Sequence, residues 1–170
     1  MYNPIDIANY FLKKYGDKSE ITPMKLVKLV YIAHGWYLGI SDKALIDENP
    51  EAWKYGPVIP RVYHHFKDYG RKAITINYFP NDPDDNLPEK IKTFLDKIWQ
   101  VYGKFSAIQL SAKTHEIGTP WYITWSKLIQ NNNMKRKTGF GIFSSQIPDN
   151  IIKEYYKKKV AINKVESKSS

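Results

Sequence analysis

The 170-residue chain contains no cysteine, and this absence excludes several kinds of chemistry. Without a thiol the protein forms no disulfide, has no cysteine nucleophile and binds no metal through thiolate ligands. The sequence also has no apolar run approaching the roughly 20 residues that a membrane-spanning helix needs. Its first residues show no basic stretch followed by an apolar block, as a signal peptide would. We therefore expect a cytoplasmic protein without a membrane partner.

The common motifs for catalysis, metal binding and nucleotide binding are also missing. The sequence contains no HExxH pair, no acidic ladder with metal-ligand spacing and no glycine-rich phosphate loop. The adjacent His64 and His65 diverge by about 100° on a helix, so they do not readily share a metal ion. His34 lies in a strongly apolar segment, and His115 lies near a predicted helix end. We expect no enzymatic activity, no cofactor and no metal. A small hydrolase that needs His64 or His115 is a third possibility, after the two functions considered below.

Acidic residues are scarce at the C-terminal end. The net charge of the chain is +9, and residues 131–170 hold nine Lys and Arg against three Asp and Glu, which is +6 of that excess. Residues 135–137 and 157–159 form the two basic clusters. A basic end is most often a solvated segment and less often a contact for nucleic acid or an acidic protein. We expect residues 1–156 to form the folded domain and residues 157–170 to form a basic, disordered tail.

The apolar pattern predicts a mainly α protein. A chain of this length fits one domain, since domains commonly run to ~100–200 residues. A capping residue before proline, a proline alone or a capping box marks six of the expected helix starts. These starts are Asn3-Pro4, Thr22-Pro23, Pro88, Ser106, Thr119-Pro120 and Pro148. Residues 23–38 are apolar nearly all round, which is typical of a central buried helix. We expect a single compact helical domain of about six to seven helices with a small β-hairpin, its strands at residues 45–46 and 52–55.

The most informative stretch is residues 52–70. Trp53 and Tyr55 alternate with small or charged neighbours, as in a strand with one buried face. Gly56-Pro57 then ends the strand, and apolar residues recur at helical spacing up to Gly70. Trp, Tyr and Arg are also the residues that anchor protein interfaces, and the chain holds more of them than one small core needs. Core and interface therefore both stay open for these aromatic residues.

The order of the motifs resembles the Panacea domain, the antitoxin family that includes SocA-like and GepA-like phage-associated proteins. The resemblance covers residues 4–156. Its most specific part is the ordered pair KLxKLxY and WxYGPV, and three other segments agree with it. The matching segments are IDIANYFL, ITPMKLVKLVYIAHGWYL, AWKYGPVIPRVYHHFKDYG, LSAKTHEIGTPWYITW and the last helix.

This resemblance implies a mostly helical domain that binds and neutralises a protein toxin encoded by an adjacent gene, in some relatives by delivering it to a cellular protease. With the aromatic-rich stretch, it defines two sets of candidate residues. The partner-binding candidates are Lys28, Trp53, Tyr55, Arg61, Tyr63 and Trp121. The structural candidates are Tyr31, Gly56, Pro57, Val58, His115 and Pro120. The alternative is a basic accessory protein that binds nucleic acid through its C-terminal lysines.

Overall fold

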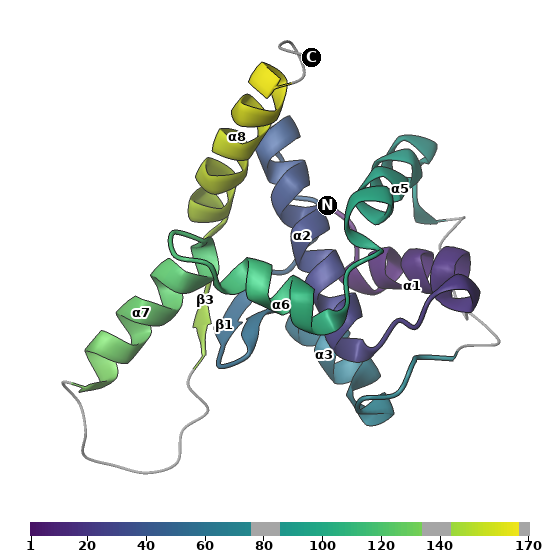
Figure 1. The fold of residues 1–170 in the computed structure, drawn as a ribbon, viewed down its shortest axis with the longest axis horizontal. Helices are drawn as coiled ribbons and strands as arrows, with labels where there is room; N and C mark the ends of the chain where they lie inside the picture. Colours follow the sequence, from purple (N-terminus) through teal and green to yellow (C-terminus); the bar gives the residue numbers. More distant parts are fainter. Residues whose placement is uncertain (76–85, 134–143, 167–170) are drawn as a thin grey trace.

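The computed structural model describes residues 1–75, 86–133 and 144–166, and in these residues it is mainly helical, as predicted (Figure 1). Seven α-helices are described, and a short 3₁₀ turn follows the first and the third. The helices are α1 (Pro4–Tyr15), α2 (Pro23–Ser41), α3 (Pro60–Phe66), α5 (Glu89–Tyr102), α6 (Ala107–His115), α7 (Pro120–Asn133) and α8 (Asp149–Glu166). The strands are β1 (Glu51–Trp53), β2 (Gly56–Val58) and β3 (Ser145–Gln146), in the antiparallel order β2-β1-β3.

Helix α2 runs through the middle of the molecule and contacts α1, α3, α5, α6, α8 and strand β2 (Figure 1). Its start follows from the sequence, because the Thr22 hydroxyl accepts a hydrogen bond from the Lys25 amide and Pro23 occupies the first turn. Every residue from Lys25 to Gly35 is buried. The nearly continuous apolar surface is therefore used on all sides, which confirms the prediction of a central helix.

Two lysines of α2 are buried, although lysine is rarely buried without a partner. Lys25 is 6% exposed and Lys28 is 2% exposed. The Lys25 ammonium donates to the carbonyl of Gly103 at 2.7 Å and to the hydroxyl of Ser19 at 3.2 Å, so it holds the loop that follows α5. Burial lowers the pKa of Lys25. Helix α2 thus fixes neighbouring backbone with charged side chains as well as with apolar contacts.

Helix α8 packs along the C-terminal half of α2 at two glycines. A Cβ atom at Gly35 would overlap the Tyr156 ring, and one at Gly39 would lie 2.8 Å from the Tyr156 backbone. At the start of α8, Asp149 lies 3.0 Å from the buried His34 ring nitrogen. Only glycine lets the two helices approach this closely, and the paired His34 and Asp149 fix their register.

Regular structure continues past the expected boundary at residue 156. Helix α8 continues to Glu166, so residues 157–166, which we expected in a disordered tail, are helical. The reason lies in the packing of its lysines. Lys157 and Lys153 both reach the Asp42 carboxylate, at 2.5 Å and 3.6 Å, and Lys159 lies over the Tyr155 ring. These contacts tie the basic segment to the end of α2 and to its own preceding turn.

The β-hairpin exists, but its strands differ from the predicted pair. Strands β1 and β2 form it, with Lys54 and Tyr55 in the turn, whereas Ile46 makes only an isolated bridge with Tyr2. Gly-Pro was interpreted as the end of a strand, yet Gly56 has a φ of 106°, which lets the chain reverse and return along β1. Pro57 is tolerated because β2 is an edge strand of the sheet.

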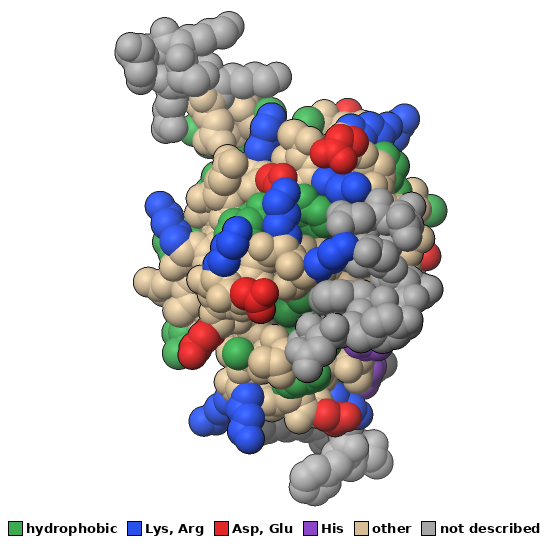
Figure 2. Space-filling view, turned by 90° about the vertical axis from the view of Figure 1, so that its right-hand side faces the viewer, with side chains coloured by type: hydrophobic (Ala, Val, Ile, Leu, Met, Phe, Trp, Pro, Cys, Tyr) green, Lys and Arg blue, Asp and Glu red, His purple; other side chains and the backbone are tan. Residues whose placement is uncertain are grey.

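Lys and Arg side chains are spread across the face of the molecule that Figure 2 presents, with hydrophobic side chains exposed between them. On that face they do not form one continuous basic stripe. In residues 1–75, 86–133 and 144–166, no helix has the length and apolarity needed to cross a bilayer, and no cluster of three metal-ligating side chains is found.

Candidate functional site

The residues that the sequence singled out meet at the hairpin corner, which we define as residues 51–58 and which lies against the N-terminal half of α2. Lys28 projects from α2 beneath this corner. Its ammonium donates hydrogen bonds to the carbonyl oxygens of Tyr55 and Pro57, both at 2.9 Å. The motif KLxKLxY followed by WxYGPV therefore has a direct physical basis, because the second lysine of one segment holds the turn of the other.

Gly56 is required at this corner for two reasons. Its φ of 106° is one that side-chain-bearing residues rarely adopt. A Cβ atom here would also lie 2.9 Å from Cε1 of His115 and closer still to Nζ of Lys28. The turn can therefore cover the buried lysine only because position 56 has no side chain.

Helices α6 and α7 support the corner from the other side. The Ser111 hydroxyl donates to the Tyr55 carbonyl at 3.3 Å, and the Trp121 indole donates to the Trp53 carbonyl at 2.8 Å. Nδ1 of His115 donates to the Ser111 carbonyl at 2.5 Å, and the His115 ring packs on Trp121 with centroids 3.9 Å apart. These bonds make His115 and Ser111 supports of the corner, and the Ser111 hydroxyl also lies 3.3 Å from Nδ1 of His115.

The outer face of the corner carries an aromatic surface. Tyr55 is 71% exposed at the tip of the turn. Trp53, two residues before it, meets the Tyr63 ring edge to face at 4.9 Å, both rings being half-buried, and the exposed His64 ring lies 5.3 Å from Tyr63. The Trp53 indole donates to the Glu51 carboxylate at 2.7 Å. An exposed tyrosine on a rigid support is a typical anchor for a protein partner.

Arg61 lies next to this surface at the start of α3, but its charge is already paired. Its guanidinium contacts the carboxylates of Asp47 and Glu48, and its backbone amide donates to Glu48. The arginine therefore joins the loop before β1 to α3. Its side chain is 41% exposed and still offers an edge to a partner.

The predicted site residues thus fall into three groups. Tyr55 and Arg61 are exposed, whereas Trp53 and Tyr63 are half-buried on the same surface. Lys28 and Trp121 lie inside the molecule and support that surface from beneath. The residues expected to be structural lie around the corner and along α2, and all are buried except His115, which is half-buried. They are Tyr31, Gly56, Pro57, Val58, His115 and Pro120.

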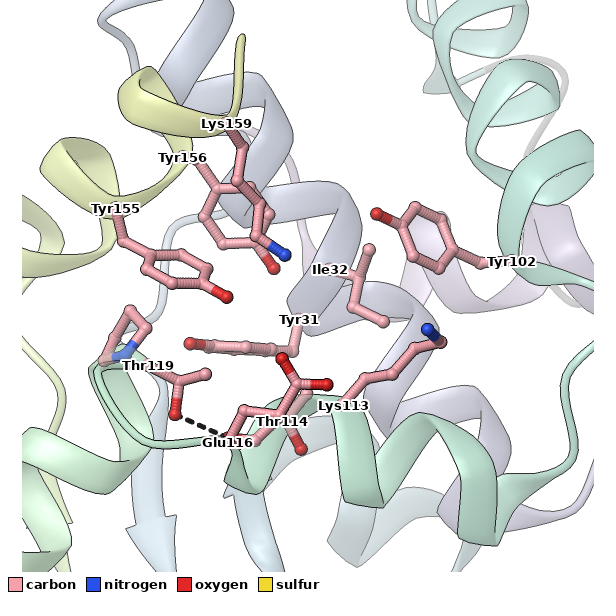
Figure 3. A pocket seen from close by; sticks show the side chains of 11 residues that line it. Tyr31, Ile32, Tyr102, Lys113, Thr114, Glu116, Thr119, Tyr155, Tyr156 and Lys159 are labelled. Carbon is pink, nitrogen blue, oxygen red and sulfur yellow. Dashed lines mark hydrogen bonds between the residues drawn. The ribbon is translucent and has the colours of Figure 1, made fainter. Parts of the chain in front are cut away.

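A second candidate is a polar cavity of about 120 Å³ near the middle of α2, lined mainly by α2, α6 and α8 (Figure 3). The Tyr31 and Tyr155 hydroxyls point into it, and Lys113, Glu116 and Lys159 also line it. The buried Tyr31 hydroxyl has no hydrogen-bond partner among the residues that the structure describes. We call this space the tyrosine cavity.

The tyrosine cavity offers several hydrogen-bond donors. Burial raises the pKa of Tyr31, of Tyr102 and of Tyr156, so these hydroxyls are protonated at neutral pH and act as donors. A volume of about 120 Å³ is enough for several water molecules or a small polar molecule. The cavity is therefore suited to hydrating the buried tyrosines or to binding a small polar ligand.

Sequence reasoning missed the roles of Lys28 and Ser111. Lys28, a partner-binding candidate by sequence, is a buried brace, and Ser111, which the sequence pattern does not single out, supports the Tyr55 carbonyl. One signal was present in the sequence: Lys25 and Lys28 are the only charged residues in the apolar segment from Pro23 to Leu38. Two lysines within an otherwise apolar helix indicate buried lysines, each of which needs its own hydrogen-bond acceptor.

Comparison with known proteins shows the family of the chain. The family model described as "Antitoxin SocA-like, Panacea domain" matches residues 26–122, which include the braced hairpin corner and end in the first turn of α7. The chain is 30% identical over 167 residues to Antitoxin SocA of Caulobacter vibrioides (strain NA1000 / CB15N), covering 92% of this chain and 84% of that protein. No solved structure matches it significantly. On this evidence the chain belongs to the SocA-like antitoxin family with the Panacea domain.

Proposed function

We propose that the protein is a non-enzymatic antitoxin that binds a protein toxin directly, in the cytoplasm, and so neutralises it. Membership of the SocA-like antitoxin family supports the role. The observation that carries the mode of action is the hairpin corner, where a buried lysine, Ser111 and Trp121 hold the backbone and leave Tyr55 exposed. Such preorganisation lowers the entropy cost of binding.

The contact surface that we propose is the outer face of this corner. Tyr55 is its central anchor, with Trp53 and Tyr63 at its side and Arg61 at its edge. Tyrosine, tryptophan and arginine carry much of the energy in protein interfaces because each buries a large area and also offers polar bonds. Lys28 and Trp121 contribute indirectly by keeping the carbonyls of the corner in place.

Co-expression tests this proposal. The open reading frame next to the gene is expressed alone and together with this protein, and growth is measured. Arrest by the neighbour alone, with rescue by this protein and co-purification of the two, is the expected result. Tyr55→Ala should weaken the purified complex at least tenfold, whereas Tyr122→Ala, at an exposed tyrosine of α7, should not. Failure of the wild-type protein to rescue would refute the antitoxin role, and unchanged binding by Tyr55→Ala would refute the corner as the contact.

The same strains distinguish sequestration from delivery to a protease. In sequestration the toxin accumulates in the complex, so its level on an immunoblot stays constant or rises when the antitoxin is present. In delivery the toxin level falls and recovers when the protease is inactivated. We propose sequestration as the principal mode, because the exposed anchors of the corner form a binding surface by themselves.

Nucleic-acid binding is the alternative function. Of the two basic clusters, residues 135–137 lie outside the described residues, and the other lies on α8, where Lys157 is paired with Asp42. Salt titration separates the two classes, because phosphate contacts release counterions and their affinity falls steeply with salt. Weak binding to a 20-nucleotide single strand at 50 mM salt would argue against this alternative.

A further inference from the structure

An apolar groove of about 590 Å³ lies between the C-terminal half of α2 and the helices on either side of it, α5 and α8 (Figure 1). Its volume falls within the range of roughly 300–1,000 Å³ that is usual for ligand sites. Three of its side chains are large, apolar and exposed: Ile40 on α2 at 60%, Val101 on α5 at 54% and Ile162 on α8 at 56%. Exposed apolar residues from three separate helices gather here, and such a patch marks an interaction site.

The shape of the groove suits a helix. On α5 the lining residues Phe94, Ile98 and Val101 follow each other at spacings of four and three, so they form one stripe. This stripe is about 10 Å long at 1.5 Å per residue, which is two helical turns. The opposite wall is α8, with Ile162 at the same groove, and Trp36 and Ile40 of α2 form the floor. Three helices around an open apolar channel are the geometry of helix-in-groove recognition.

The charges at the groove define the chemistry of the occupant. The charged residues that line it are Lys97 on α5 and Lys159 on α8, and no Asp or Glu is among its described lining residues. Neither lysine forms an ion pair with a described residue; Lys159 lies over the Tyr155 ring at 4.9 Å. A second copy of this chain would bring its own net charge of +9 against them. An acidic partner complements both walls.

We propose that this groove binds one acidic amphipathic helix of the toxin. Apolar side chains at positions i, i+3 or i+4, and i+7 of that helix face Ile40, Val101 and Ile162, and Asp or Glu residues on its flanks face Lys97 and Lys159. That the helix belongs to the toxin rests on the proposed function, whereas its chemistry rests on the groove alone. Because the hairpin corner packs against the other half of α2, the toxin is held at two separate sites, which raises the overall affinity.

A designed peptide tests the chemistry without the toxin. The probe is a fluorescein-labelled 18-residue helix with leucines at the spacing given above and glutamates on both flanks, and a matched peptide carries lysines in place of the glutamates. Binding to the full chain is measured by fluorescence anisotropy. We expect the acidic peptide to bind at least tenfold more tightly than the basic one. Lys97→Glu with Lys159→Glu should remove or reverse this preference, whereas Lys67→Glu, at an exposed lysine in the turn after α3 that does not line the groove, should leave it intact.

Variants in the groove locate the site. Ile40→Asp and Val101→Asp should each weaken the acidic peptide at least tenfold, and the control Ile117→Asp, at an isoleucine that is 85% exposed outside the groove, should not. Melting curves check that each variant is folded, which we expect because all three side chains are exposed. Equal binding of the two peptides, no binding of the acidic one, or wild-type binding by folded Ile40→Asp and Val101→Asp would overturn the proposal.

A rescue assay then tests the assignment to the toxin. The double variant Ile40→Asp, Val101→Asp should lose rescue of growth while its melting temperature stays near that of the wild type. If the wild type rescues and the folded double variant rescues equally well, the groove does not bind the toxin, and the proposed antitoxin function stands. If the wild type itself fails to rescue, the antitoxin function fails, whereas the peptide measurements still decide the chemistry of the groove.

Discussion

Replacing Lys28 with methionine tests the central physical argument, namely that the buried ammonium braces the hairpin corner. Methionine is close to lysine in length but has no donor, so the substitution removes both hydrogen bonds to the Tyr55 and Pro57 carbonyls and leaves the space filled. The Tyr55 carbonyl keeps its bond from Ser111, whereas the Pro57 carbonyl loses a charged donor in a buried environment.

The magnitude follows from these contacts. A buried acceptor that loses its partner costs about 1–3 kcal/mol, and a bond from a charged donor is worth about 1.5–3 kcal/mol. Relief of the cost of burying the ammonium offsets part of this loss. We expect Lys28→Met to lower the free energy of unfolding by about 2–4 kcal/mol at pH 7, read from urea denaturation followed by tryptophan fluorescence.

The pH dependence gives a second, independent readout. Burial lowers the pKa of Lys28 to about 7, below its ordinary value of 10.5 in the unfolded chain. Between these two values the unfolded state binds the proton and the folded state does not, so stability rises with pH. Below pH 7 both states are protonated, and the full cost of burying the ammonium is present. The neutral amine keeps two N–H groups, enough for both carbonyls.

The wild type should therefore gain stability relative to Lys28→Met between pH 7 and pH 10, by at most about 1.4 kcal/mol per pH unit. Urea denaturation of both proteins at pH 7, 8 and 9 measures the difference. If Lys28→Met is as stable as the wild type at each pH, the lysine does not brace the corner. A difference that is present but constant with pH would leave the brace intact and contradict the lowered pKa.

Three further predictions concern packing and are measured by thermal or urea unfolding. Gly56→Ala should lower the free energy of unfolding by more than about 2 kcal/mol, because the new methyl group strains the backbone and also overlaps the Lys28 side chain. Gly118→Ala, at a φ of 86° with open space around it, should cost only the backbone strain. Gly35→Ala should lower stability by about 1–3 kcal/mol by pushing α8 away from α2. Equal losses for Gly56→Ala and Gly118→Ala, or a gain in stability for Gly35→Ala, would contradict the close packing at these glycines. Trp121→Ala should cost about 3–5 kcal/mol and Trp53→Ala less, because the first ring is buried and the second half-exposed; the reverse order would place the core elsewhere.

Local signals in the sequence predicted the helices well. Thr22 caps α2, a helix whose apolar surface extends all round, and Pro23 begins it, while Ser106 with Gln109 forms the capping box that opens α6. Such signals act over three or four residues, so the chain itself contains the whole cause. For the hairpin, the predicted strand at residues 52–55 overlaps β1, whereas the one at residues 45–46 is wrong; the true partner is β2, which depends on the positive φ of Gly56.

The end of the chain shows the opposite case. A run of lysines by itself is typical of a solvated tail, and we expected one after residue 156. The helix continues because Lys153 and Lys157 form ion pairs with Asp42, which lies at the end of α2, more than 110 residues earlier in the sequence. Pairings over such distances leave no local pattern. They become visible only when the fold brings the two helices together.

The sequence by itself determined the mainly helical class, the central position of α2 and the family, because periodicity, capping and an ordered motif are all properties of neighbouring residues. Only the tertiary structure decided what the motif does. It placed Lys28 beneath the hairpin instead of on the surface, and left Tyr55 exposed above it. It also brought Ile40, Val101 and Ile162 from three helices to one groove. Burial and contact depend on how distant segments pack, and no single segment carries that information.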